Sequence, residues 1–117
     1  MDIKIKRVYE PSDPSDGYRI LIDRLWPRGI KKEALRLDEW AKELAPSTEL
    51  RKWFHHQPEL FDEFAKKYRE ELKEHQANLA RILEIAKNQP ITLLYAAREP
   101  KYNQAGILLD FLLSKQN

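Results

Sequence analysis

The chain has 117 residues and a formal net charge of +2, with 42% hydrophobic and 34% charged residues. This length and composition are typical of a globular domain, and we expect a single domain over 1–117. The nearly balanced charge argues neither for nor against an anionic partner, which must therefore be recognised by local charge clusters. The absence of cysteine excludes disulfides, thiolate catalysis and zinc sites built on sulfur.

The first residues and the apolar runs predict the location of the protein. The opening segment, MDIKIKRVYE, alternates charged and apolar residues, unlike the apolar core of a signal peptide. No apolar run in the sequence approaches the roughly 18 residues that span a bilayer. We therefore expect a cytoplasmic protein that has no membrane partner.

Two strands are predicted in the N-terminal part of the chain. Residues 2–9 alternate apolar and basic side chains, which indicates a half-buried strand. Residues 10–17, EPSDPSDG, are rich in turn-forming residues and predict a loop. Residues 18–23, YRILID, form a nearly continuous apolar run, as in a strand covered on both faces. The connector that follows, PRGIKKEALR, is predicted to be irregular.

The apolar pattern changes to a helical period after the connector. Asp38 is the predicted N-cap of a first short helix, and Ser47 is the predicted N-cap of a second. A third apolar stripe begins at Pro58 and keeps its phase for about 28 residues, which exceeds the usual length of a globular helix. We expect a break near His75–Asn78, and a single long helix is the alternative.

The C-terminal part returns to a strand and then a helix. Residues 89–97, QPITLLYAA, predict a strand, and Asn103 is the predicted N-cap of the last helix. A long helical crossover between strands favours parallel pairing. We therefore predict an α/β fold with a small, mostly parallel sheet of about three strands and helices packed around it.

Three sequence motifs carry a family resemblance. They read GYRILIDRLWPRG, W-x-x-x-L-A-P-S-x-x-L-R-x-W-F-x-H and TLLYAAREPKYNQA. Together they resemble the DUF488 family, in particular its short YeaO-like branch, over essentially the whole chain. The resemblance implies an α/β fold and supplies no reaction. Longer members of that family carry a cysteine where this chain has Tyr95, so a thiol-based role does not transfer to it.

Polar side chains follow the predicted strands at the edge where open α/β sheets bind ligands. The set is Asp23, Arg24, Trp26 and Arg28 after the second strand, and Arg98, Tyr102 and Asn103 after the third. Arginine suits carboxylate and phosphate oxygens, and the helix N-terminus at Asn103 adds backbone N–H donors, so an anion cradle is predicted. The alternative is that these arginines pair with nearby carboxylates in structural ion pairs.

The segment after the second strand combines a rigid loop with a carboxylate. Trp26 is predicted to anchor the loop in the core, and stacking on a ligand or a guanidinium is the alternative. Asp23 is a candidate general base or metal ligand. We favour a role in orienting an arginine, because Arg24 beside it is expected to lower the pKa of Asp23.

Further candidates lie on the second short helix and the one after it. The family resemblance marks Ser47, Arg51, Trp53 and His56 as typical positions. Histidine exchanges protons near neutral pH, so His56 is a candidate proton donor, with an exposed or capping role as the alternative. No partner stands at metal-ligand spacing from it. The segment KKYREELKE is predicted to form a solvent-exposed helical face. Tyr68 within it is predicted to be a core residue, and the alternative is that its hydroxyl reaches the ligand crevice.

Two classes of function fit the sequence best. The first is a protein that binds a phosphate- or carboxylate-bearing small molecule through Arg24, Arg28, Arg51 and Arg98, with Asp23 and His56 as candidate acid and base. The sequence has no GxGxxG motif, P-loop or cysteine nucleophile, which argues against standard dinucleotide, nucleoside-triphosphate and thiol chemistry, and we expect no cofactor. We also expect no metal, because His56 has no partner at metal-ligand spacing.

The second class is a nucleic-acid-binding or regulatory module. In it, the short helices of 38–56 form a helix-turn-helix. Trp53 and Phe54 on the second helix indicate packing, and a net charge of +2 is low for a DNA-reading domain. A protein–protein scaffold is the remaining alternative.

Overall fold

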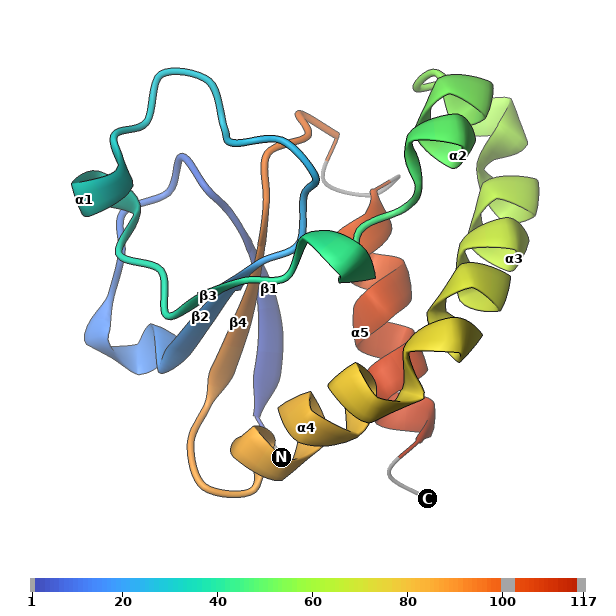
Figure 1. Cartoon of the computed structure of the whole chain (residues 1–117). Helices are drawn as coiled ribbons and strands as arrows, with labels where there is room; N and C mark the ends of the chain where they lie inside the picture. The colour runs from blue at the N-terminus through green and yellow to red at the C-terminus, as the bar shows by residue number, and fades with distance from the viewer. Residues whose placement is uncertain (1, 100–102, 116–117) are drawn as a thin grey trace.

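A parallel sheet forms the centre of the molecule. The computed structural model describes residues 2–99 and 103–115, so Tyr102 lies outside the described residues. The four strands are β1 (Ile3–Arg7), β2 (Tyr18–Leu21), β3 (Glu39–Trp40) and β4 (Ile91–Tyr95). They pair in the order β1-β4-β2-β3, and every pairing is parallel (Figure 1). The α/β prediction is confirmed, and the sheet has one strand more than the three predicted.

The central strand is β4. It pairs with β1 from Ile3 opposite Ile91, and with β2 from Tyr18 opposite the same residue. Every residue of β4 is buried, because both faces of the sheet are covered. Its one polar side chain, Thr92, donates its hydroxyl to the carbonyl of Asp16 at 2.8 Å. Because all five residues of β4 are buried, the sequence of this strand is a nearly continuous apolar run.

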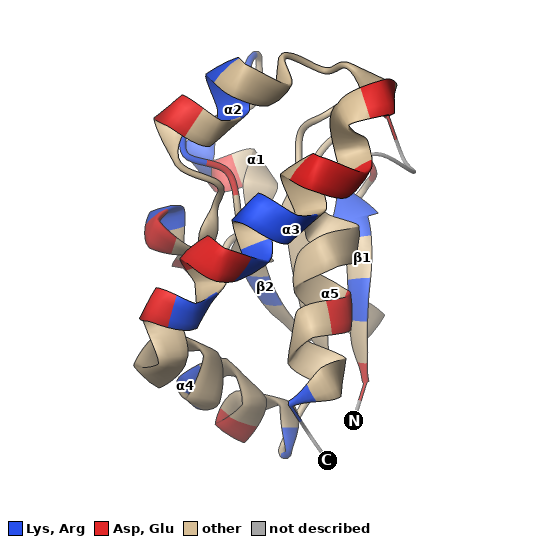
Figure 2. Cartoon of the chain, turned by 90° about the vertical axis from the view of Figure 1, so that its right-hand side faces the viewer, with Lys and Arg blue, Asp and Glu red and all other residues tan. Residues whose placement is uncertain are grey.

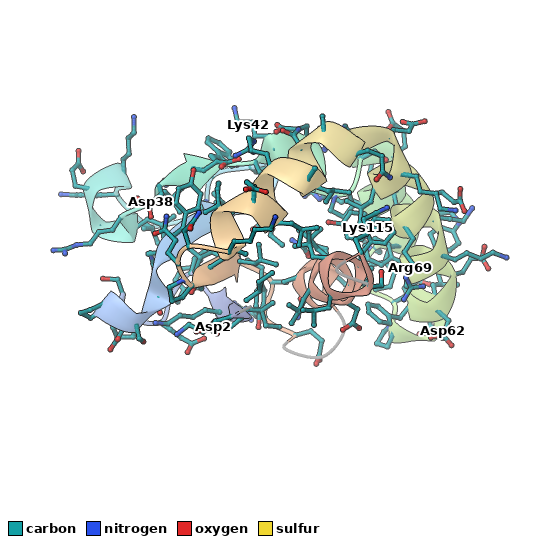
Figure 3. The ribbon with its side chains drawn as sticks, turned by 90° about the horizontal axis from the view of Figure 1, so that it is seen from below. Asp2, Asp38, Lys42, Asp62, Arg69 and Lys115 are labelled. Carbon is teal, nitrogen blue, oxygen red and sulfur yellow. The ribbon has the colours of Figure 1, made fainter. Side chains whose placement is uncertain are left out.

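The two faces of the sheet are covered by different kinds of structure. Helices α3 (Phe61–Leu72), α4 (Gln76–Ala86) and α5 (Gln104–Ser114) cover one face (Figures 1 and 3). The other face is covered by residues 24–37, which include α1 (Lys32–Leu35), through a smaller apolar cluster. None of the helices in the described part of the chain is long and apolar enough to cross a membrane.

The first predicted short helix is wrong. Glu39 and Trp40 form the edge strand β3 beside Ile20 and Leu21, and Lys42–Leu44 form a single 3₁₀ turn. The sheet edge accounts for the difference, since the N–H of Ala41 donates to the carbonyl of Leu21 at 2.8 Å. Residues 38–56 therefore do not contain the helix pair of a helix-turn-helix.

Other helix predictions are confirmed by their caps and breaks. Ser47 caps α2 (Thr48–Phe54) by accepting a hydrogen bond from the N–H of Leu50, and Asn103 caps α5. A 3₁₀ turn at Lys73–His75 separates α3 from α4, so the predicted break near His75 is confirmed. The connector predicted to be irregular contains the one-turn helix α1.

Candidate ligand site at the carboxyl edge of the sheet

The chain leaves the neighbouring strands β2 and β4 in opposite directions. After β2 it passes into residues 24–37 on one face of the sheet, and after β4 it continues into α5 on the other face (Figure 1). Such a topological switch point is the usual place of ligand crevices in open α/β sheets. The groups that act on Asp23 there are the backbone N–H of Ala96, the side chain of Gln104 and the charge of Arg51, and with Asp23 we call them the switch-point site.

Asp23 joins the two sides of this switch point. One carboxylate oxygen accepts a hydrogen bond from the N–H of Ala96 at 2.9 Å, and the other accepts from the side-chain amide of Gln104. Burial raises the pKa of Asp23, although these two hydrogen bonds and the positive charge of Arg51 act to lower it. The expectation that Arg24 lowers this pKa is therefore wrong.

Arg24 binds backbone instead of Asp23. Its Nε donates to the carbonyl of Pro46 at 2.9 Å, and one terminal nitrogen donates to the carbonyl of Ala45 at 3.3 Å. These bonds fix the guanidinium against the segment that leads into α2. Arg24 forms no ion pair with a carboxylate among the described residues, which was the alternative role predicted for it.

A cavity of about 150 Å³ lies beside Arg24. We call it the side cavity; its lining comprises Arg24, Glu43, Ala45, Ser47, Tyr68, Glu71, Leu72, Glu74 and His75. Tyr68 is fully buried and donates its hydroxyl to the carbonyl of Leu44 at 2.6 Å. Burial raises the pKa of Tyr68, and the charges of Glu71, Asp23 and Arg24 also act on it. The lining of the side cavity includes none of the switch-point residues, and Arg24 is the lining residue that follows Asp23 in the chain.

Glu71 is a site residue that the sequence analysis missed. It accepts hydrogen bonds from the N–H of Ser47 at 2.9 Å and from the hydroxyl of Ser47 at 2.5 Å. The outward face of α3 carries charges of both signs, as a solvated helix does (Figure 2), but Glu71 is only half-exposed. The signal was its spacing: Glu71 stands three residues after Tyr68 and seven after Phe64, on the apolar stripe.

The predicted cations of the edge are spread over several elements. Arg51 is exposed on α2, and its charge acts on Asp23. Arg98 is exposed three residues after the end of β4. Arg7, which the sequence analysis treated only as part of an alternating strand, ends β1 and donates from Nε to the carbonyl of Ala97 at 2.9 Å. Its position as the last residue of a strand was the available signal.

Asn103 has a structural role at the start of α5. Its side-chain oxygen accepts from the N–H groups of Ala105 at 2.9 Å and Gly106 at 3.3 Å, and its amide nitrogen donates to the carbonyl of Glu99. The first N–H groups of α5, which were expected to face an anion, therefore have a partner within the chain.

Trp26 anchors its loop, as predicted, and Arg28 lies elsewhere. The indole N–H of Trp26 donates to the carbonyl of Ile30 at 2.6 Å, and its ring meets the Trp40 ring edge-on at 5.4 Å. Arg28 is exposed, and its carbonyl accepts from the hydroxyl of Tyr9 at 2.9 Å. No contact among the described residues joins the guanidinium of Arg28 to that of Arg24.

His56 lies in the turn between α2 and the next helical segment. It is exposed and adopts a left-handed backbone conformation with φ 55°, and its ring centroid is 6.5 Å from that of Phe54. The described contacts do not connect His56 to Asp23, so the structure does not bring the two candidate catalytic residues together. The described part of the chain also contains no group of three side chains suited to hold a metal.

These features define a small α/β protein with an open parallel sheet and a polar site at its carboxyl edge. The sequence profile of the family described as "Inactive DUF488-N3 subclade" matches residues 2–117. The chain therefore belongs to the DUF488 family, which confirms the resemblance seen in the three motifs.

Similar proteins occur in distant bacteria. The chain is 54% identical to the uncharacterized protein YeaO of Escherichia coli (strain K12) over 97% of its own length and 99% of that protein. It is 46% identical to uncharacterized proteins of Mycobacterium tuberculosis and Mycobacterium bovis, over 94% of its length and 92% of theirs. No solved structure shows a significant match.

Proposed function

We propose that this protein binds a small anionic molecule of the cytoplasm, bearing a phosphate or a carboxylate, at the switch-point site. The observation that carries the proposal is the position of Asp23 at the carboxyl ends of β2 and β4, where it is bound by Ala96 and Gln104 and acted on by the charge of Arg51. A half-buried carboxylate bound by both walls of a switch point is a fixed, directional polar group, which is what a binding site needs to orient a ligand.

The roles of the edge residues follow from their exposure and bonding. Asp23 accepts a hydrogen bond from a donor group of the ligand, because a carboxylate has more acceptor positions than Ala96 and Gln104 occupy. Arg51 and Arg98 are exposed and supply the positive charge that meets the anionic group. Arg28 is left out of this proposal because its described contacts lie beside Tyr9.

Binding without catalysis is the form of the proposal that has the more support. The candidate acid and base, His56 and Asp23, do not meet in the described contacts. The matching family is itself described as an inactive subclade. No observation favours the nucleic-acid-binding alternative, whose pair of helices is absent from 38–56.

The test is a titration with inorganic phosphate followed by ¹H–¹⁵N NMR. We compare the wild type with Arg51→Gln and with the matched control Lys52→Gln, which changes the same charge at the next exposed position of α2. Removing one charge-assisted hydrogen bond costs about 1.5–3 kcal/mol, so Arg51→Gln is expected to weaken binding at least about tenfold. The control is expected to bind as the wild type does.

Two outcomes of this titration contradict the proposal. One is the absence of shifts at the amides of Asp23, Ala96 and Gln104. The other is an equal effect of Arg51→Gln and Lys52→Gln, which indicates a diffuse charge effect. Binding of random duplex DNA that weakens steeply with salt would support the nucleic-acid module instead.

A further inference from the structure

Opposite charges line the side cavity without neutralising each other. Arg24 enters it from the loop after β2, and Glu71 enters it from α3. Within the described residues, no ion pair joins the two side chains; Arg24 binds backbone carbonyls and Glu71 binds Ser47. A separated cation and anion on the lining of one cavity present complementary charge to a ligand that carries both signs.

Both charged groups are fixed before any ligand arrives. Two carbonyls hold the guanidinium of Arg24, and the N–H and hydroxyl of Ser47 hold the two oxygens of Glu71. A guanidinium has five N–H donors and a carboxylate has about four acceptor positions, so each group keeps bonding capacity for a ligand. Because the side chains are already ordered, binding does not have to pay for ordering them.

The size and charge of the side cavity limit what it can take. Its volume of about 150 Å³ corresponds to roughly five water molecules, which suits a molecule of a few non-hydrogen atoms. Glu43 and Glu74 add negative charge to the lining, so a lone anion is disfavoured. A lone cation would meet Glu43, Glu71 and Glu74 but would leave the remaining N–H donors of Arg24 without an acceptor. A zwitterion satisfies both groups.

We propose that the side cavity binds the zwitterionic head of a small amino acid, with its ammonium at Glu71 and its carboxylate at Arg24. This names the class of the ligand proposed above and, in that respect, rests on the proposed function. The two sites are neighbours along the chain, since Asp23 of the switch-point site and Arg24 of the side cavity are consecutive residues. A ligand of this class places a second anionic group, beyond its amino-acid head, at the switch-point site.

The probes of the test are L-alanine, acetate and methylammonium, each titrated into the ¹⁵N-labelled protein. L-Alanine carries both charges, and the other two carry one each. Shifts at the amides of Ser47, Tyr68 and Glu71 are expected with L-alanine, at an affinity at least about tenfold above that of either single-charge probe. Acetate that binds as tightly as L-alanine would overturn the proposal in favour of a simple anion site.

The matched variants are Glu71→Gln and Glu70→Gln, neighbours on α3. Glu70 is exposed and bonds only to Lys73 at 3.0 Å among the described residues. Glu71→Gln is expected to weaken L-alanine binding about tenfold and to leave the phosphate affinity of the switch-point site unchanged, whereas Glu70→Gln changes neither. L-Alanine binding that survives Glu71→Gln would contradict the proposal.

A second variant keeps the test decisive if Glu71→Gln disturbs the bond to Ser47 and the fold. Glu74 lies exposed on the lining of the cavity, and Glu74→Gln is expected to weaken L-alanine binding about twofold to threefold through its charge. Phosphate shifts without L-alanine shifts would remove the side-cavity proposal alone. L-Alanine shifts without phosphate shifts would remove the switch-point proposal alone.

Discussion

At the scale of single residues, the most tightly held charge is a carboxylate outside the candidate site. Asp16 is fully buried, and its carboxylate forms salt bridges with Nζ of Lys6 at 3.1 Å and with a terminal nitrogen of Arg19 at 2.5 Å. Asp16→Asn leaves the charges of Lys6 and Arg19 without their buried partner, so the free energy of unfolding is expected to fall by about 3 kcal/mol. Urea titration measures this change. The control is Asp62→Asn, an exposed residue on α3 (Figure 3), with an expected change below about 0.5 kcal/mol.

The pH dependence of the same pair of proteins is a second prediction. Burial acts to raise the pKa of Asp16, but hydrogen bonds from the N–H of Asp13 and from Lys6 and Lys4 outweigh it and lower the pKa from 3.8 to about 2. A lowered pKa in the folded state stabilises the protein above the unfolded pKa and ceases to do so as the pH falls through the folded pKa. The difference in unfolding free energy between wild type and Asp16→Asn should therefore shrink between about pH 4 and pH 2. A difference independent of pH would contradict this origin.

Asp23 is expected to behave in the opposite way. Because burial raises its pKa, its ionisation costs stability as the pH rises above the range of an ordinary carboxyl. Asp23→Asn keeps an acceptor for the N–H of Ala96, and Gln104 accepts from the new amide by turning its own. We expect the free energy of unfolding at pH 7 to stay equal or rise by up to about 1 kcal/mol.

The comparison that completes this prediction is Asp23→Ala. That change leaves the N–H of Ala96 without its acceptor and is expected to cost about 1–3 kcal/mol in a urea titration at pH 7. Any gain from Asp23→Asn should disappear near pH 3, where the wild-type carboxyl is also neutral. A large loss in Asp23→Asn would show that Asp23 is kept for stability and not for ligand binding.

At the scale of elements, two helix ends differ in backbone conformation. The C-cap residue of α2, His55, has a left-handed conformation with φ 45°, whereas the C-cap residue of α4, Lys87, has φ −67°. A left-handed conformation costs a non-glycine residue about 1 kcal/mol, so His55→Gly is expected to raise the free energy of unfolding by up to that amount. Lys87→Gly should lower the free energy of unfolding by about 0.5–1 kcal/mol. Lys87 is not in a left-handed conformation, so glycine relieves no strain there and only increases the conformational entropy that is lost on folding. Equal signs in thermal unfolding would contradict this account.

Two glycines make a similar contrast. Gly17 precedes β2 with φ +64°, and a Cβ on it would lie 2.2 Å from the carbonyl oxygen of Pro90. Gly17→Ala is expected to cost about 3 kcal/mol through both the conformation and the contact. Gly106 lies inside α5, and a Cβ on it would meet no atom of another element within 4 Å, so Gly106→Ala should stabilise by about 0.5–1 kcal/mol. Denaturant titration of both variants checks the pair.

The elements that the sequence predicts well are those fixed by neighbours along the chain. The caps at Ser47 and Asn103 and the break before α4 depend on local hydrogen bonds and helical phase. β3 depends instead on pairing with Ile20 and Leu21, and two residues carry no readable period. Tertiary pairing therefore overrides the helical pattern that surrounds it.

The candidate site divides in the same way. The sequence predicts that Asp23 follows a buried strand, and the structure places it at the carboxyl edge of β2. The partners of Arg24 and Ser47 are 21 to 24 residues away along the chain, and a single sequence does not indicate which distant groups meet. Glu71 could have been predicted from the sequence, because its spacing from Tyr68 places it on the apolar stripe.

At the scale of the whole molecule, the centre of the sheet is encoded near the end of the chain. β1 and β2 do not pair with each other; both pair with β4. The switch-point site depends on the same late segment, since Asp23 is bound by Ala96 and Gln104. The fold and the candidate site should therefore form together, and only after β4 has joined the sheet.

A divided chain tests this dependence. A fragment of residues 1–88 lacks β4 and α5, so its strands have no common partner, and we expect no cooperative unfolding transition by circular dichroism. Adding a peptide of residues 89–117 should restore the transition and the phosphate-induced shift at Asp23. The control peptide carries Leu93→Asp, which puts a charge at a fully buried position of β4 and should restore neither. Cooperative unfolding of 1–88 alone would contradict the central role of β4, because the remaining strands would then hold together without the pairing that the sheet order requires.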